Sequence, residues 1–135
     1  MGTSLDVKLE ITSWDEKPFR ELAGDRKLAR ADVELSSSDG AIEATAIMSM
    51  LLYYTADDSS TYVALLSVEG SLDGRSGGFA MTGNGTYDGT VSRLELSIVP
   101  GSGTGELAGI RGTATSVSTH QDYPHMPLTL DYDLS

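Results

Sequence analysis

Residues 5–11 read LDVKLEI, an unbroken alternation of apolar and polar side chains. A period of two is typical of a β-strand that buries one face and exposes the other. The end of the chain repeats this pattern in LTLDYDL at residues 128–134, where the apolar side chains again fall on one face. Both ends of the chain therefore predict half-buried strands, and with them an all-β fold.

Six further segments between these ends have the length and composition of strands, at residues 29–35, 42–54, 61–72, 77–87, 90–99 and 113–119. Asp-Gly pairs at residues 39–40, 73–74 and 88–89 predict tight hairpin turns, because both residues tolerate the positive φ that such turns need. Successive hairpins favour a single eight-stranded antiparallel barrel, since closure removes the exposed sheet edges. On pattern alone a β-sandwich remains the alternative. The 135 residues leave room for one domain, residues 1–135.

Two segments interrupt the alternation, and we expect both at ends of the barrel. Residues 13–27 are rich in charge and contain Trp14 and Pro18, so a loop folded over one end is predicted. Residues 120–127 contain two prolines and both histidines and predict a second end loop. The only helix we expect is a single turn near residues 106–108.

The composition narrows the classes of partner. The chain has 20 Asp and Glu against 9 Lys and Arg, a net charge of −11, which predicts repulsion from nucleic acids and anionic membranes. It has no cysteine, so disulfides and thiolate chemistry are excluded. The first residues lack a secretory pattern, and the longest apolar stretch, residues 46–54, is too short to span a bilayer as a helix. A cytoplasmic location is expected.

Two further patterns suggest chemistry, and each has a simpler structural interpretation. The glycines between residues 101 and 109 lack the Lys-Ser/Thr of a phosphate-binding loop, and Ser102 among them lacks a nucleophile elbow. A sharp connection where backbone approaches backbone is the favoured interpretation. His120, Asp122 and His125 match no strong metal template, so a solvated loop is favoured there. No metal and no other cofactor is predicted.

The chain resembles an uncharacterised bacterial family, a domain of unknown function whose members have the allene-oxide-cyclase-like barrel fold. The resemblance rests on SWDEKPF at residues 13–19, EGSLDGRSGGF at 69–79, GTYDG at 85–89, VPGSGTGELAGIRG at 99–112 and LDYDL at 130–134. It covers essentially the whole chain, and the glycine-rich stretch is its most specific part. It implies an up-and-down, calycin-like barrel rather than a sandwich, and it implies no particular activity.

Two positions depart from the family pattern, which has a glutamate where this chain has Leu66 and a histidine where it has Gly83. The alternation places both positions on the inward face. The resemblance then implies that this member has exchanged two polar groups of the lumen for apolar surface and space, which suits a hydrophobic guest. On this interpretation Gly83→Phe blocks ligand uptake and leaves the fold intact.

The inward-facing side chains define a candidate site for a small hydrophobic molecule. Three tyrosines are the candidate catalytic groups, because a phenol can donate one directed hydrogen bond inside an apolar pocket: Tyr62, Tyr87 and Tyr132. The residues expected to shape the pocket, with Trp14 closing its mouth, are Met48, Met50, Leu66, Phe79, Met81, Gly83, Leu96 and Ile98. Ordinary core packing is the alternative for each of them.

Three hypotheses for the function follow. In the first, the barrel binds a polyketide- or lipid-like molecule and promotes its cyclisation or isomerisation by confinement, without a cofactor. The analogy with cyclases of the same fold supports this only at the level of architecture. In the second, the barrel is a non-catalytic carrier or sensor. In the third, its interior is filled and its role is structural or interactive.

An apolar patch is expected on the outer face of the third and fourth strands, at Ile47, Leu51, Val63 and Leu65. Exposed apolar surface of this kind usually marks an interface, so we expect a homo-oligomer that packs through this hairpin. Coverage by residues 13–27 is the alternative.

Overall fold

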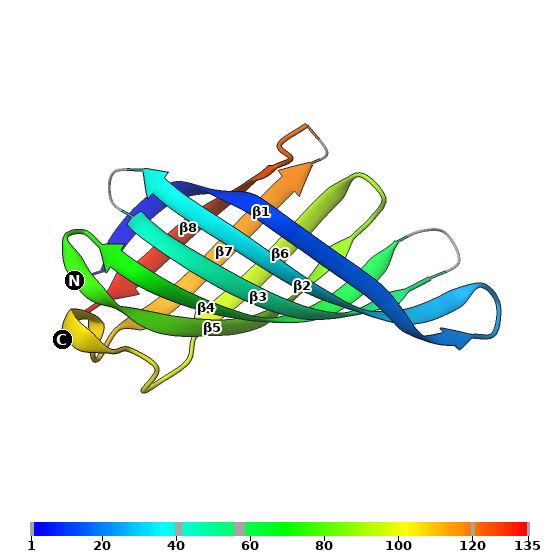
Figure 1. Cartoon of the computed structure of the whole chain (residues 1–135), viewed down its shortest axis with the longest axis horizontal. Coiled ribbons are helices and arrows are strands. Elements are labelled where there is room, and N and C mark those ends of the chain that lie inside the picture. Colours follow the sequence, from blue (N-terminus) through cyan, green and yellow to red (C-terminus); the bar gives the residue numbers. More distant parts are fainter. Residues whose placement is uncertain (1, 40–41, 56–58, 120, 135) are drawn as a thin grey trace.

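The computed structural model describes residues 2–39, 42–55, 59–119 and 121–134, and it contains a closed barrel of antiparallel strands (Figure 1). The strands are β1 Thr3–Leu22, β2 Arg26–Asp39, β3 Ile42–Tyr54, β4 Ser60–Leu72, β5 Arg75–Tyr87, β6 Val91–Ile98, β7 Arg111–Thr119 and β8 His125–Asp133. Each strand pairs with its neighbour in sequence, and β8 pairs with β1 to close the ring. The predicted eight-stranded up-and-down barrel is confirmed.

Burial follows the alternation of the sequence. On β3 the side chains of Met48 and Met50 are buried, whereas Ile47 and Leu51 beside them are exposed on the outer face. The two inward methionines pair across the β3–β4 ladder with Leu66 and Ala64, which are also buried. The inward face of the barrel is thus the hydrophobic core, as a period of two requires.

Residues 13–27 do not form the predicted loop. β1 continues through this segment to Leu22 and pairs with β2 from Arg26 onward, so that only residues 23–25 form the turn. Gly24 and Asp25 have φ values of 75° and 62° in that turn. The resulting β1–β2 hairpin projects past the other strands at the right of Figure 1. It leaves the outer patch of β3 and β4 uncovered, because Ile47 is 59% exposed.

Two β-bulges explain why this part of β1 lacks a regular alternation. The register with β2 shifts between Ile11 and Ser13, and again between Pro18 and Arg20. An extra residue in one strand reverses the face of every side chain beyond it. After the first bulge, Trp14 therefore lies opposite the buried residue Val33 and turns toward the lumen.

The β6–β7 connection closes one end of the barrel. It contains the short 3-10 helix η1 (Gly105–Leu107), which matches the single helical turn expected there, and it buries Leu107 and Ile110. Its side chains Ser102 and Thr104 accept hydrogen bonds from backbone N–H groups of β5, each at 3.0 Å. The glycine-rich segment is a close backbone connection, since a Cβ on Gly103 would lie 2.1 Å from a backbone oxygen.

The second predicted end loop is shorter than expected. Residues 121–124 form a turn, and β8 begins at His125. The Asp122 carboxylate accepts hydrogen bonds from the backbone and the hydroxyl group of Thr119, at 2.8 and 3.2 Å, and so serves to hold the turn. His120 lies outside the described residues. Among those that are described, no helix is long and apolar enough to cross a membrane.

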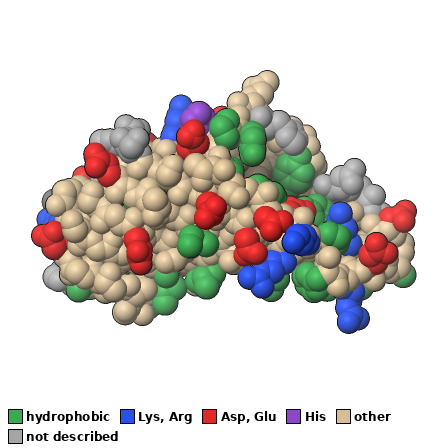
Figure 2. All heavy atoms as spheres, viewed as in Figure 1, with side chains coloured by type: hydrophobic (Ala, Val, Ile, Leu, Met, Phe, Trp, Pro, Cys, Tyr) green, Lys and Arg blue, Asp and Glu red, His purple; other side chains and the backbone are tan. Residues whose placement is uncertain are grey.

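The charge of the protein is unevenly distributed. Five of the nine Lys and Arg residues lie between residues 17 and 30, in the projecting hairpin. Figure 2 shows acidic side chains spread along this face, while most of the visible Lys and Arg side chains gather on the half that carries the hairpin. Lys17 and Arg30 lie 3.9 and 3.4 Å from the carboxylates of Asp15 and Asp32. Both pairs are exposed, so they contribute little to stability.

Candidate functional site

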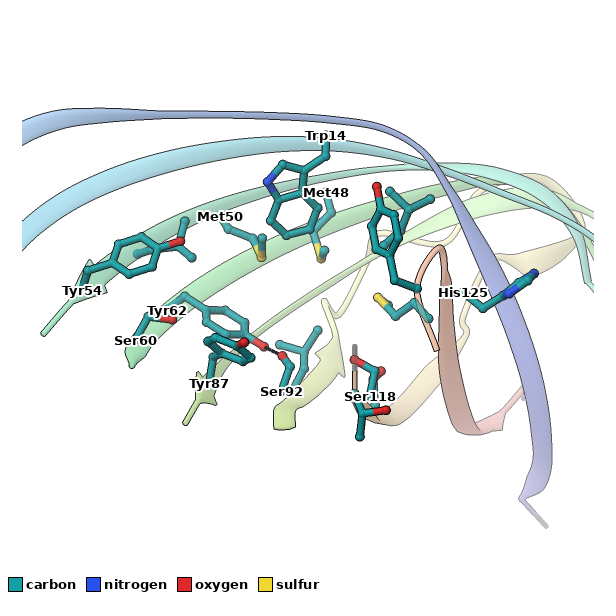
Figure 3. Close-up of a pocket in the computed structure, with 17 residues that line it drawn as sticks. Trp14, Met48, Met50, Tyr54, Ser60, Tyr62, Tyr87, Ser92, Ser118 and His125 are labelled. Atoms are coloured by element: carbon teal, nitrogen blue, oxygen red, sulfur yellow. Dashed lines mark hydrogen bonds between the residues drawn. The ribbon is translucent and has the colours of Figure 1, made fainter. Parts of the chain in front are cut away.

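The end of the barrel that carries the projecting hairpin is hollow. Its cavity has a volume of about 620 Å³ and opens to solvent. Seventeen residues line it: Ile11, Trp14, Met48, Met50, Leu52, Tyr54, Ser60, Tyr62, Tyr87, Ser92, Leu94, Ser116, Ser118, Thr119, Tyr123, His125 and Met126 (Figure 3). Cavities of about 300–1,000 Å³ with mainly apolar walls are typical small-molecule sites.

The opposite half of the barrel is filled. Leu66 and Met81 are 0% and 1% exposed there, and Leu107 of η1 packs beneath them in the same core. The void found near Phe79 and Leu107 measures about 10 Å³, at the lower limit for one water molecule. The lumen is therefore open at one end only.

The candidate residues from the sequence divide between these two halves. Trp14, Met48, Met50, Tyr62 and Tyr87 line the cavity, and they come from four different strands. Trp14 is 43% exposed, as a residue at the mouth would be.

The second group faces inward but lies among the buried core side chains, away from the cavity: Leu66, Phe79, Met81, Leu96 and Ile98. The alternation predicted their face correctly. It carries no information on their depth along the barrel axis, which decides whether a side chain packs or lines a cavity.

Gly83 does not create space in the lumen. A Cβ at this position would lie 1.8 Å from the backbone oxygen of Glu95 and 2.9 Å from Cα of Leu96. The absent side chain thus allows β5 and β6 to approach each other closely. The expectation that Gly83→Phe fills a lumen and spares the fold is wrong, because any side chain here meets the backbone of β6.

Tyr132 lies apart from the other two candidate tyrosines. Its side chain is buried near the closed end, where its hydroxyl donates a hydrogen bond to the carboxylate of Asp73 in the β4–β5 turn. Burial, followed by the bond to Asp73, raises the pKa of Tyr132. This phenol holds a turn against β8 and has no contact with the cavity.

A polar cluster at the mouth was missed by the sequence analysis. The Glu16 carboxylate accepts a hydrogen bond from Trp14 Nε1 at 3.2 Å and another from the Tyr54 hydroxyl at 2.5 Å. Lys27 Nζ lies over the Tyr54 ring, 4.8 Å from the ring centroid. Burial and the bond to Glu16 raise the pKa of Tyr54, so its hydroxyl stays protonated and acts as a donor. Only the bulge before Ser13 brings Glu16 to this face, and nothing in the alternation signals that bulge.

Tyr62 reaches across β5 to the neighbouring strand. Its hydroxyl lies 2.6 Å from Oγ of Ser92 on β6, and its ring covers Gly85. A Cβ on Gly85 would lie 2.7 Å from the phenol, so glycine is what permits this crossing. Burial raises the pKa of Tyr62 despite the opposing effect of the Ser92 bond, and the phenol remains neutral.

Apart from His125, the polar side chains of the lining are hydroxyl groups and the indole of Trp14, and the chemistry that they offer is hydrogen bonding. Among the lining residues none is Asp, Glu, Lys or Arg. Within the described part of the chain, no group of three His, Cys, Asp or Glu side chains is arranged to hold a metal ion. The phenols and serine hydroxyls can orient a guest, and the Met and Leu side chains can exclude water from it.

Comparisons with known proteins agree with the architecture. A family model described as "Protein of unknown function (DUF3224)" matches residues 6–132. The crystal structure of a DUF3224 protein of unknown function from Shewanella oneidensis MR-1 is 28% identical, with a TM-score of 0.79. The alignment covers 100% of this chain and 99% of that one. No curated protein matches the sequence.

Proposed function

The chain belongs to the DUF3224 family, a family of unknown function, and from this premise we propose that its barrel is a receptor for one small, mainly apolar molecule. The ligand occupies the open half of the lumen, between the methionines of β3 and the aromatic side chains at the mouth. The family match and the full-length structural match confirm the predicted relation to an uncharacterised family, and they assign no activity.

The cavity of about 620 Å³ carries this proposal. Protein interiors are normally packed as densely as organic crystals, and the closed half of this barrel follows that rule. A hollow of this size within the same small core is a departure whose usual purpose is ligand binding. Its wall supports an apolar guest, since Met48, Met50 and Leu52 form one continuous side.

Binding without turnover is the function that we favour. No Asp or Glu side chain is among the described lining residues, and the carboxylate of Glu16 at the mouth already accepts two hydrogen bonds. Cyclisation or isomerisation by confinement is a second candidate, supported by the Tyr62–Ser92 pair, whose protonated phenol can polarise a carbonyl group. Recovery of the bound molecule unchanged separates the two, because a carrier returns its ligand and an enzyme converts it.

A neutral apolar dye tests the binding itself. N-phenyl-1-naphthylamine should bind the wild-type protein saturably at one site per chain, with a rise in dye fluorescence as water is excluded. Leu52→Trp adds bulk to the cavity wall and should abolish the rise. Leu51→Trp adds the same bulk one residue away on the outer face and should leave it unchanged. Absence of saturable binding, or equal binding by both variants, would contradict the proposal.

A further inference from the structure

The wall of the cavity has two unlike sides, and from this we infer the class of ligand. We propose that the cavity takes an uncharged molecule with an apolar edge and a hydroxyl or carbonyl edge, oriented with its polar edge toward the serines of β6 and β7. This inference rests on the proposed function and adds to it the charge and the orientation of the guest.

The two sides lie opposite each other. In a closed ring of eight strands, β3 and β7 are four strands apart and face each other across the lumen. β3 contributes only Met48, Met50, Leu52 and Tyr54 to the lining, whereas β7 contributes only Ser116, Ser118 and Thr119. Figure 3 shows Met48 and Met50 on one side of the cavity and Ser92 and Ser118 on the other.

The hydroxyl groups occur where the lumen is open. Along the inward face of β6, Ser92 and Leu94 line the cavity, and Leu96 and Ile98 follow in the packed half. Along β7, Ser116 lines the cavity, while Ala114 lies deeper among the core residues. On β7 the inward side chains change from hydroxyl to hydrocarbon where the cavity ends, and on β6 the hydroxyl group is at the position nearer the mouth.

Burial makes these hydroxyl groups informative. Ser60 and Ser116 are each only 5% exposed although they line the cavity. A hydroxyl group removed from water costs free energy unless it forms a hydrogen bond. An apolar residue would serve equally well at these positions if the guest were a pure hydrocarbon. A serine hydroxyl that faces the cavity can form a hydrogen bond with a hydroxyl or carbonyl group of the guest, which an apolar side chain cannot do.

The described lining residues include no Asp, Glu, Lys or Arg side chain, and this favours an uncharged guest. A charged group buried without a partner is strongly unfavourable, because it loses its hydration. At the mouth, the Glu16 carboxylate already accepts hydrogen bonds from Trp14 and Tyr54, and Lys27 lies over the Tyr54 ring. His125 lines the rim but is exposed to solvent. A cationic or anionic head group would therefore meet no Asp, Glu, Lys or Arg side chain among the described residues that line the cavity.

Calorimetric titration with matched naphthalene probes tests the inference. 2-Naphthylmethanol is neutral and carries a hydroxyl group, 2-naphthylmethylammonium is a cation, 2-naphthoate is an anion, and 2-ethylnaphthalene has no polar group. The alcohol should bind wild-type protein about tenfold more tightly than either ion, which corresponds to about 1.4 kcal/mol. The double variant Ser116→Ala/Ser118→Ala should bind the alcohol about tenfold more weakly than the wild type does, and its affinity for 2-ethylnaphthalene should be unchanged.

The control is Thr115→Ala/Val117→Ala, which changes the outward neighbours on the same strand and should affect no probe. Tighter binding of either ion than of the alcohol, or equal weakening of the alcohol and 2-ethylnaphthalene by the serine variant, would overturn the inference while the receptor function stands. Failure of all four probes to bind would instead count against the receptor function itself.

Discussion

At the scale of single residues, Gly83 is the position where a side chain has least room. A Cβ there would lie 1.8 Å from the backbone oxygen of Glu95, far inside van der Waals contact. Gly83→Ala forces β5 and β6 apart, and overpacking of this kind costs about 1–3 kcal/mol. We expect this loss in the free energy of unfolding measured by urea titration.

Gly2→Ala is the matched control for this prediction. A Cβ on Gly2 would lie 3.7 Å from the backbone oxygen of Tyr132, an ordinary contact, so its stability should equal that of the wild type. If Gly83→Ala unfolds at the same urea concentration as this control, β5 and β6 do not approach each other closely at Gly83.

The tyrosines of the mouth predict how stability depends on alkaline pH. Burial, and then the hydrogen bond to Glu16, raises the pKa of Tyr54 above the value of about 10 that it has in the unfolded chain. The unfolded state then loses its phenolic proton first, so this contribution to stability is complete below about pH 10 and declines above it. Tyr54→Phe removes the ionisable group and should flatten the decline.

Urea unfolding at pH values from 8 to 11 measures the effect. The discriminating quantity is the slope of unfolding free energy against pH above about pH 10, where the free Tyr phenol ionises. It should be smaller in magnitude for Tyr54→Phe than for the wild type. Equal slopes in the two proteins would mean that Tyr54 ionises alike in both states, contrary to the expectation.

At the scale of elements, the first bulge of β1 decides which residues reach the mouth. The extra residue, Thr12, reverses the faces of β1 so that Trp14 points inward. Deleting Thr12 restores the uninterrupted alternation and turns Trp14 to the outer face. Since Trp14 is the sole tryptophan, its emission should shift to the red, and its quenching by bound 2-naphthylmethanol should disappear.

Thr12→Ala keeps the bulge and loses only the 3.2 Å side-chain bond to the backbone of Glu34. It should retain the emission of the wild type. Identical emission of the deletion and this control would show that the bulge does not orient Trp14.

The same bulges mark the limit of what the sequence predicts about the elements. The third strand was predicted at residues 42–54 and is observed at Ile42–Tyr54, because its buried and exposed side chains alternate without a break. In β1 the extra residues near Thr12 and Phe19 interrupt that alternation, and the charged segment between them resembles a loop. Pro18 also favours the prediction of a loop, although proline is tolerated in a strand beside a bulge.

At the scale of the whole molecule, the outer apolar patch predicts self-association. Ile47, Leu51, Val63 and Leu65 are 52–59% exposed and lie together on paired strands. We expect a homo-oligomer to bury this patch, and Val63→Glu to dissociate it because a carboxylate is costly in an apolar interface. Native mass spectrometry measures the number of subunits.

Ser97→Glu, which adds the same charge to the exposed face of β6, is the control and should preserve the assembly. A wild-type protein that is monomeric at micromolar concentration, or a Val63→Glu variant with unchanged subunit number, would contradict this prediction.

The location of the site shows what the sequence leaves undetermined about the whole molecule. Met50 and Leu66 have the same inward orientation, yet one lines the cavity and the other is fully buried. The alternation of apolar and polar residues predicts on which face of the sheet a side chain lies, but not how deep in the barrel it lies. The depth at which packing ends depends on how the β6–β7 connection inserts Leu107 and Ile110 beneath the strands, and this is set by contacts between distant parts of the chain.

Leu107 and Ile110 are buried at one end of the barrel and close it, so the lumen opens to solvent only at the other end. In the receptor proposed above, a guest would leave by the route through which it entered, so one molecule would have to depart before the next could bind. A long chain cannot thread through, and its surplus length remains in solvent beside Trp14. The proposed receptor would therefore recognise only the inserted end of its guest, and molecules that share this end but differ in their tails should compete with equal affinity.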